Sequence, residues 1–163
     1  MRLTSDAVSA LVSQLEKEFR SIEENWDLNT VAWERIEHGA DHPLDWAALG
    51  YTLHAAYTAM ENYFLRVVKA FENDVPRESW HREVLDRMQL EVSGVRPALL
   101  DRDSTRLIDE LRAFRHVFRS LYDERLDPER LALLQRRAPT ARAAFARAHE
   151  AFLPKVVALI EEQ

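Results

Sequence analysis

Four residues that suit phosphate chemistry lie close together in the second half of the chain. Arg112, Arg115, His116 and Arg119 fall within eight residues, with no acidic residue between them. Guanidinium groups stay charged and donate paired hydrogen bonds to phosphate oxygens, and an imidazole exchanges a proton near neutral pH. This basic cluster could cleave RNA without a metal or cofactor. Histidine would assist the attack of the 2′-hydroxyl or protonate the leaving oxygen, while arginine would stabilise the charged phosphorane.

Helical periodicity gathers the basic cluster on one side of a helix. At about 100° per residue, the apolar residues of this segment cover an arc from about 140° to 260° relative to Arg112. These residues are Leu107, Leu111, Phe114, Val117, Phe118 and Leu121. We expect this stripe to be buried and the basic cluster to face away from it. The alternative is an ordinary solvated helix surface, whose arginines pair with carboxylates such as Asp109 or Asp123.

Apolar residues recur at intervals of three and four along most of the chain, which predicts helices. Gly, Pro and capping residues mark the predicted ends. The first helix ends near Gly39, and the second runs from an Asp41 cap and Pro43 to Asn73. The third runs from Ser79 to Gly94, and the fourth is capped by Ser104 or Thr105. The last helix follows Pro128 and bends at Pro139 and Pro154. The sequence therefore predicts an all-α bundle of four to five helices in an antiparallel up-down arrangement.

Composition narrows the class of protein. A chain of 163 residues suits a single helical domain that spans residues 1–163. The absence of cysteine excludes disulfides and thiolate chemistry, and it fits a cytoplasmic protein. Three glycines leave little room for a Gly-rich phosphate loop, and neither a Walker loop nor a GxGxxG motif is present. No apolar run approaches the roughly 18 residues that a membrane span needs, so we expect no membrane association.

The net charge of −6 argues against a protein that coats nucleic acid. Residues 1–60 hold ten acidic and four basic residues, whereas the remaining 103 residues hold 18 of each. The excess negative charge therefore belongs to the first part of the chain. An acidic protein with one confined basic cluster indicates a directed anion site.

Other polar residues give weaker signals. Glu61 lies on the second predicted helix, where it could orient Arg115 or His116 or simply pair with a base such as Arg66. We interpret His54 as a packed or half-exposed helix residue and expect a cap or packing role for His81. Residues 37–42 contain two acids and two histidines, but Gly39 and Pro43 break the helix that would align the histidines. We therefore predict a turn there and no metal site.

Three segments resemble HepT-like ribonuclease toxins of the HEPN superfamily. DELRAFRHVFRSLYDERLD (residues 109–127) is similar to the active-site helix of that group, and residues 57–72 and 79–100 match it in order and spacing. The likeness covers approximately residues 45–130. It implies a homodimer of helical bundles whose active helices line a cleft, with metal-independent cleavage of RNA. It also implies a minimal nucleotidyltransferase antitoxin as partner, which in some members adds AMP to a tyrosine of the toxin.

The hallmark of that group is an Arg, a polar residue, a few further positions and a His, often with a Tyr two residues later. In the best register Arg115 is the hallmark Arg and His116 is the polar residue, while Ser120 stands at the His position and Tyr122 at the Tyr position. The resemblance thus assigns catalysis to Arg115 and leaves His116 as the local acid–base group. Arg112 or Arg119 would hold phosphate, Glu61 would orient the cluster, and Tyr122 would be the modified residue.

Because serine cannot replace imidazole in proton transfer, the departure at Ser120 keeps a second hypothesis open. The first hypothesis is an endoribonuclease toxin, weakened by this change. The second is a non-catalytic subunit that holds a nucleotide or substrate for a nucleotidyltransferase. A third is an interaction protein without an anion site.

Overall fold

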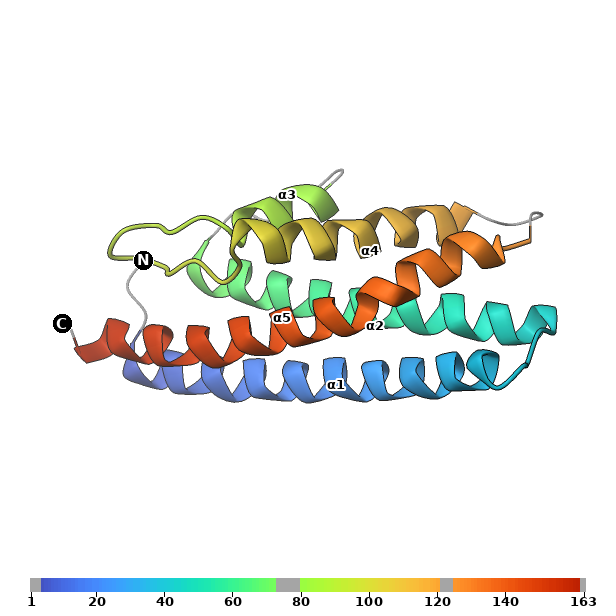
Figure 1. Cartoon of the computed structure of the whole chain (residues 1–163). Helices are drawn as coiled ribbons and strands as arrows, with labels where there is room; N and C mark the ends of the chain where they lie inside the picture. Colours follow the sequence, from blue (N-terminus) through green and yellow to red (C-terminus); the bar gives the residue numbers. More distant parts are fainter. Residues whose placement is uncertain (1–3, 73–79, 121–124, 162–163) are drawn as a thin grey trace.

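The computed structural model describes residues 4–72, 80–120 and 125–161, and these residues form five helices and no strand. Four helices are long and one is short: α1 (Ser5–Glu37), α2 (Pro43–Phe71), α3 (Trp80–Arg87), α4 (Arg102–Ser120) and α5 (Pro128–Glu161). Each long helix runs opposite to the long helix before it, and α3 lies beside α4 (Figure 1). The predicted all-α, up-down bundle is confirmed.

Helix α2 is the centre of the bundle, because it packs against each of the other four helices. Its sequence is apolar on most of its circumference, which is typical of a helix surrounded by neighbours. The fully buried side chains that it contributes to the core are Leu49, Leu53, Ala56, Tyr57, Met60, Tyr63, Phe64, Val67 and Val68. A polar residue on such a helix is carried into the interior, and Glu61 is one of these.

The start of α2 differs from the prediction. His42, not Asp41, is the N-cap: its Nδ1 accepts a hydrogen bond from the Leu44 amide at 3.1 Å, and the Asp45 carboxylate accepts one from the His42 amide at 3.2 Å. This reciprocal pair closes the first turn, as in a capping box. Asp41 instead accepts a hydrogen bond from the indole Nε1 of Trp46.

Helix α3 is shorter than predicted, since it ends at Arg87 and not at Gly94. The buried side chain of Arg96 explains this end, because it folds back and donates a hydrogen bond to the Arg87 carbonyl at 2.9 Å. The same guanidinium contacts Glu72 at 3.2 Å. The chain that follows α3 is therefore held against the end of α2. The predicted cap at Ser79 lies outside the described residues.

The cap of α4 is Asp101, one turn before the predicted Ser104 or Thr105. Its carboxylate accepts a hydrogen bond from the Ser104 amide at 2.7 Å, and this bond lowers the pKa of Asp101. Ser104 and Thr105 are instead buried in the first turn. This cap fixes where α4 begins, and hence which residues of the basic cluster face α2.

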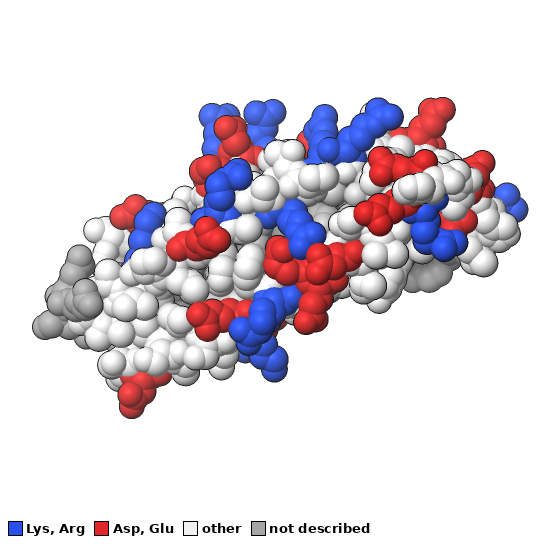
Figure 2. Space-filling view, turned by 60° about the horizontal axis from the view of Figure 1, so that its bottom comes forward, with Lys and Arg blue, Asp and Glu red and all other residues white. Residues whose placement is uncertain are grey.

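Helix α5 continues through Pro139 and Pro154 without a break. It curves along its length, with its N-terminal half near α4 and its C-terminal half beside α1 (Figure 1). Acidic and basic side chains are interspersed on the face where α1 comes forward (Figure 2), so no large area of one charge covers it. Within the described ranges, no helix is long and apolar enough to cross a membrane.

Candidate active site

The basic cluster does not lie on one face of α4 as predicted. Arg115 turns toward α2 and its side chain is only 13% exposed, whereas His116 and Arg119 are exposed. On the helical wheel Arg115 stands about 40° from Leu111, which is buried, so a long side chain at that position can follow the packed surface. The cluster is therefore divided between a buried guanidinium and an outer group of polar side chains.

Glu61 is the partner that draws Arg115 inward. The glutamate is 3% exposed, and its Oε1 lies 3.8 Å from Nη2 of Arg115. A buried carboxylate is costly unless a positive charge or hydrogen-bond donors surround it. The predicted contact between Glu61 and Arg115 is thus present. The alternative partner, Arg66, pairs with Glu18 at 2.8 Å instead.

His81 from α3 completes the environment of this carboxylate. Its Nδ1 lies 2.7 Å from Oε2 of Glu61, and its side chain is 30% exposed. One glutamate therefore joins three helices: α2 carries it, α4 contributes Arg115 and α3 contributes His81. We call Glu61, His81 and Arg115 the Glu61 triad. The prediction of a cap or packing role for His81 misses this contact, since no motif in the sequence connects residues 61 and 81.

The outer part of the cluster is partly neutralised. Nε of Arg112 lies 2.6 Å from Oδ1 of Asp109, and Arg82 of α3 lies 3.8 Å from the same carboxylate. For Arg112 the structure thus shows the alternative given by the sequence, in which an arginine of α4 pairs with the Asp109 carboxylate. It also fixes α3 against α4 near the Glu61 triad. His116 and Arg119 extend from the following turn toward solvent.

The charges of the site shift the pKa values of two further residues of α2, His54 and Tyr57. His54 stacks on Phe118 with ring centroids 5.2 Å apart, and burial lowers its pKa, which Arg115 and Arg119 lower further. Burial raises the pKa of Tyr57, and the Glu61 carboxylate raises it further. These effects place a positive potential and a poorly solvated carboxylate at the same interface. Such perturbed groups are typical of functional sites.

The Glu61 triad contains a donor that lacks a partner. The Nε–H of Arg115 is buried without a hydrogen bond to any described residue, and Nδ1 of His54 is in the same condition. Buried polar groups in proteins are nearly always paired. An unpaired guanidinium donor beside other cations is suited to bind an anionic group, such as a phosphate.

A wide cleft of about 790 Å³ adjoins Arg119. It lies where α2 begins, α4 ends and α5 begins. Its lining combines apolar and aromatic surface with two arginines and one carboxylate, and it includes Asp41, Pro43, Leu44, Trp46, Phe118, Arg119 and Arg125. Aromatic rings next to guanidinium groups are the combination that binds nucleotide bases and their phosphates.

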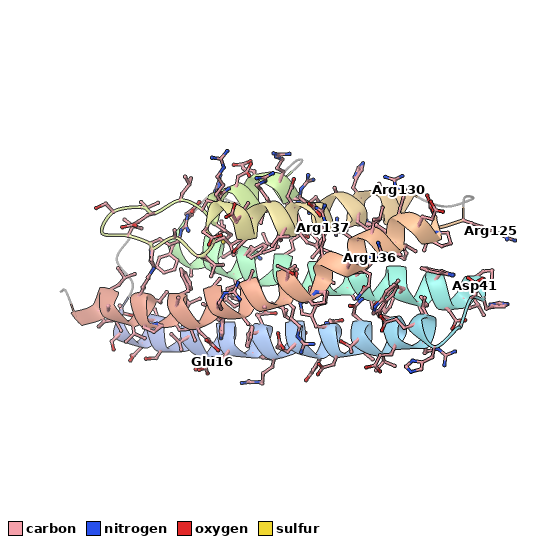
Figure 3. The ribbon with its side chains drawn as sticks, in the orientation of Figure 1. Glu16, Asp41, Arg125, Arg130, Arg136 and Arg137 are labelled. Atoms are coloured by element: carbon pink, nitrogen blue, oxygen red, sulfur yellow. The ribbon has the colours of Figure 1, made fainter. Side chains whose placement is uncertain are left out.

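The arginines of α5 do not all extend this surface. Arg125 lies just before α5 at the end of the molecule where α4 ends, and Arg130 lies on the first turn of α5, whereas Arg136 and Arg137 lie further along α5, nearer the middle of the molecule (Figure 3). Arg137 pairs with Glu110 of α4. Arg142, further along α5, pairs with Glu23 and Asp27 of α1.

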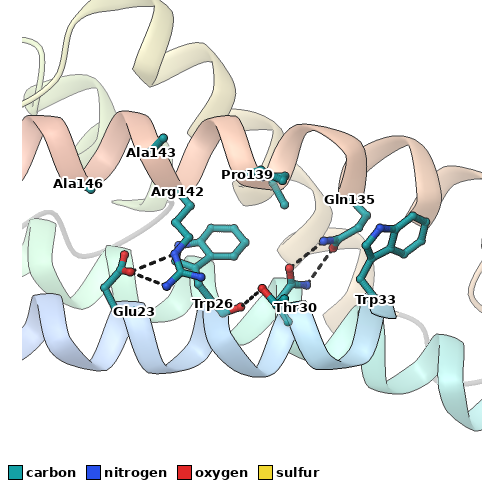
Figure 4. A pocket seen from close by; sticks show the side chains of 11 residues that line it. Glu23, Trp26, Thr30, Trp33, Gln135, Pro139, Arg142, Ala143 and Ala146 are labelled. Atoms are coloured by element: carbon teal, nitrogen blue, oxygen red, sulfur yellow. Dashed lines mark hydrogen bonds and ion pairs between the residues drawn. The ribbon is translucent and has the colours of Figure 1, made fainter. Parts of the chain in front are cut away.

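A second hollow of about 370 Å³ lies between α1 and α5 (Figure 4). Trp26 and Trp33 line it together with Arg142 and an amide pair, Asn29 and Gln135. The amides bond each other at 2.8 and 2.9 Å, and the guanidinium is paired with carboxylates. The charged and amide groups of this hollow are thus occupied by one another.

The side chains of two predicted site residues lie outside what the structure describes. Ser120 is the last residue of α4, and Tyr122 lies outside the described residues. In the part of the chain that the structure describes, no group of three His, Asp or Glu side chains is arranged to hold a metal ion. His42, from the turn considered as a metal site, caps α2.

Comparison with known proteins gives one match. A family model described as HepT-like protein matches residues 48–156, which is more than half of the chain. No curated protein and no solved structure matches the chain. The matched range includes α4, α3 and nearly all of α2, and hence every member of the Glu61 triad.

Proposed function

The chain belongs to the family of HepT-like proteins, and from this membership we propose that it is the endoribonuclease toxin of a toxin–antitoxin pair and cleaves RNA without a metal. The family is generally the toxin of such a pair. The observation that carries the proposal for this chain is Arg115. It stands at the hallmark position, is 13% exposed, and keeps a buried donor without a partner.

Arg115 binds the scissile phosphate and stabilises the phosphorane. A buried guanidinium suits this task because its interaction with a developing charge is weakly screened by water. Arg119 and Arg112 hold the neighbouring phosphates from the outer face of α4. The cleft beside Arg119, with Trp46 and Phe118, takes the adjoining bases.

His116 is the proton-transfer group on the exposed side of α4. The 2′-hydroxyl of the RNA loses its proton to a base and its oxygen attacks phosphorus, the bond from phosphorus to the 5′-oxygen breaks, and His116 protonates that leaving oxygen. The products are a 2′,3′-cyclic phosphate and a free 5′-hydroxyl. The partner in this proposal is a minimal nucleotidyltransferase antitoxin, and Tyr122 is the residue that it modifies. A homodimer brings two such sites to one cleft.

The test is cleavage of a labelled RNA by the purified protein in EDTA. We expect cleavage with cyclic phosphate ends, and we expect His116→Ala to reduce the rate at least 100-fold while the helical circular dichroism signal stays the same. Full activity of His116→Ala would remove His116 from the mechanism. A wild-type protein that leaves RNA intact would overturn the nuclease proposal.

Ser120 at the hallmark His position favours one second candidate. In this alternative the chain is a non-catalytic subunit that presents a nucleotide or substrate to a nucleotidyltransferase. Its basic cluster then only holds phosphate. Co-purification with a nucleotidyltransferase, intact RNA, and phosphate binding unchanged by His116→Ala would support it over the toxin.

A further inference from the structure

We propose that His81, oriented by Glu61, is the second acid–base group of this site and takes the proton from the attacking 2′-hydroxyl. The proposal rests on the ribonuclease function proposed above. Transesterification of RNA needs one group to accept the 2′-hydroxyl proton and another to protonate the leaving oxygen. The exposed His116 supplies only one of these two groups. Ser120 cannot supply the other, so a base has to come from another element.

The hydrogen bond to Glu61 determines which ring nitrogen of His81 is available to a substrate. The Glu61 carboxylate accepts at 2.7 Å from Nδ1, so in a neutral ring Nδ1 carries the proton and Nε2 holds the free electron pair. With the ring anchored through Nδ1, Nε2 lies on the opposite side, away from the buried carboxylate. The side chain is 30% exposed, so its outer edge can meet a substrate. A carboxylate behind an imidazole also stabilises the cation that forms when the ring accepts a proton.

The second oxygen of the same carboxylate faces Arg115. Oε1 of Glu61 lies 3.8 Å from Nη2 of Arg115, while Oε2 contacts His81. The base and the phosphate-binding guanidinium are thus held by one carboxylate group. A phosphodiester bound at Arg115 therefore has its reacting centre close to the imidazole of His81.

Helix α3 is held in place on the site, which a base needs in order to act at a fixed position. Arg82 lies 3.8 Å from Asp109 of α4, and the Trp80 ring lies against the His81 imidazole with centroids 4.0 Å apart. At its other end, Arg87 pairs with Glu72 of α2 at 2.6 Å. Contacts at both ends limit the rotation of α3 relative to α2 and α4.

The proton and the bonds balance in this step. Nε2 of His81 takes the 2′-hydroxyl proton, the 2′-oxygen forms its bond to phosphorus, and the phosphorus bond to the 5′-oxygen breaks. The leaving 5′-oxygen takes a proton from His116. Water then removes the proton from His81 and returns one to His116, so neither histidine is consumed.

The charged groups around His81 define the pH dependence of the step. Glu61 faces it from α2, Arg115 and the Arg112–Asp109 pair face this interface from α4, and Arg82 is its neighbour on α3. As the base, His81 acts only when neutral. The cleavage rate should therefore fall under acidic conditions, and this limb should depend on Glu61.

The experiment measures cleavage of a labelled RNA in EDTA between pH 5 and 9. His81→Asn keeps a donor near the position of Nδ1 for Glu61 but has no acid–base group. We expect a rate at least 100-fold below that of the wild type and loss of the acidic limb, with an unchanged melting temperature. His38→Asn, at an exposed histidine in the turn after α1, is the matched control and should cleave at the wild-type rate.

Two further measurements separate catalysis from structure. Free imidazole in the buffer should restore cleavage by His81→Ala at least 10-fold, whereas it should not change the rate of the wild type. Glu61→Gln should shift the acidic limb, because an amide stabilises the imidazolium less than a carboxylate does. Heteronuclear NMR of the wild type reports the tautomer of His81 directly and needs no activity.

The outcomes distinguish this inference from the proposed function. If the wild type cleaves RNA and His81→Asn cleaves within threefold of it, His81 is structural, and the inference alone is overturned. A neutral His81 with its proton on Nε2 also overturns it, whatever the activity. A wild type that cleaves no RNA overturns the proposed function and, with it, the role of His81.

Discussion

Two polar clusters lie inside the same bundle, and they are built in different ways. Between α1, α2 and α5, the Asn29 amide donates to Gln135 at 2.9 Å and to Thr52 at 3.0 Å, and Gln135 donates back at 2.8 Å. Between α2, α3 and α4, Glu61 receives a close hydrogen bond from His81 but only a 3.8 Å contact from Arg115. The first cluster is satisfied by its own members, whereas the second keeps a charged donor unpaired.

This difference separates a stabilising cluster from a candidate site. A satisfied amide network contributes to stability and specifies how three helices align. An incompletely paired, charged cluster costs stability, so its persistence indicates a role in binding or chemistry. The indole Nε1 of Trp26 is also buried without a described partner, but it is neutral and its cost is smaller. The guanidiniums of Arg66 and Arg96 also keep a buried Nε without a described partner, but each has another nitrogen within 3.2 Å of a carboxylate oxygen. The α2–α3–α4 interface differs because its guanidinium makes only a 3.8 Å contact with its carboxylate.

The largest expected effect tests the unpaired cluster. Arg115→Ala should lower the rate of RNA cleavage about 1,000-fold, equivalent to ~4 kcal/mol of transition-state stabilisation, because the variant lacks the buried guanidinium. Steady-state cleavage of a labelled RNA in EDTA measures this. Arg136→Ala is the control, since Arg136 is an exposed arginine of α5 outside the site. An Arg115→Ala protein as active as Arg136→Ala would show that the cluster is not the catalytic centre.

The satisfied cluster should respond in the opposite way. Asn29→Ala should lower the free energy of unfolding by about 2 kcal/mol and leave the cleavage rate of the folded protein unchanged, because the buried amide of Gln135 is left without partners. Urea denaturation followed by circular dichroism measures the change. Asn25, one turn earlier, donates its side-chain hydrogen bond to the backbone of its own helix, so Asn25→Ala should lower the free energy of unfolding far less. Equal losses in the two variants would mean that the amide network adds nothing.

Sequence reasoning recovers the bundle better than the site. The intervals of three and four apolar residues determine which face of each long helix is buried, and they predict α1, α2, α4 and α5 correctly. Sequence reasoning does not predict a helix end that depends on a side chain from a later part of the chain. Helix α3 stops at Arg87 because Arg96, nine residues later, folds back onto its carbonyl, and local periodicity contains no trace of that contact.

The site shows the same limit. The resemblance and the spacing on α4 indicate Arg115, and α2 indicates Glu61 as a possible partner of the cluster. The inward turn of Arg115 depends on how deep α4 packs against α2, which a helical wheel does not report. His81 comes from a short helix on a separate segment, so its contact with Glu61 arises only when the three helices are assembled.

A smaller effect is expected for the exposed ion pairs of Arg142, in contrast to the buried contact between Arg115 and Glu61. Arg142 bridges α5 to Glu23 and Asp27 of α1 at 2.6 and 2.8 Å, but these side chains are partly exposed. Water screens such pairs, so Arg142→Ala should cost about 1 kcal/mol or less and leave RNA cleavage unchanged. Thermal melting at low and high salt measures this, and the difference from wild type should shrink as salt rises. A loss of cleavage in this variant would extend the site to the α1–α5 interface.

The smallest effect concerns two histidines in different surroundings, the buried His149 and the half-buried His54. His149 is 6% exposed, stacks on Phe19 and shares a hydrogen bond of 2.9 Å between its Nδ1 and the Tyr63 hydroxyl, whereas Nδ1 of His54 lacks a described partner. Burial lowers the pKa of both. Below the unfolded pKa of 6.5, the unfolded chain binds protons that the folded protein does not. Stability from these histidines is therefore present at higher pH and is lost as the pH falls.

For His149 the loss between pH 7.5 and pH 6 should be under about 1 kcal/mol, because its unfolded pKa lies inside that interval. Urea denaturation at both pH values measures it in the wild type and in His149→Asn. The asparagine can still accept from Tyr63 but does not titrate, so the pH dependence of the variant should be shallower even if its stability is lower throughout. An unchanged pH dependence would mean that His149 already carries its proton in the folded protein. The hydrogen bond with Tyr63 would then run from Nδ1 of His149 to the tyrosine oxygen, and the buried imidazole would be a cation.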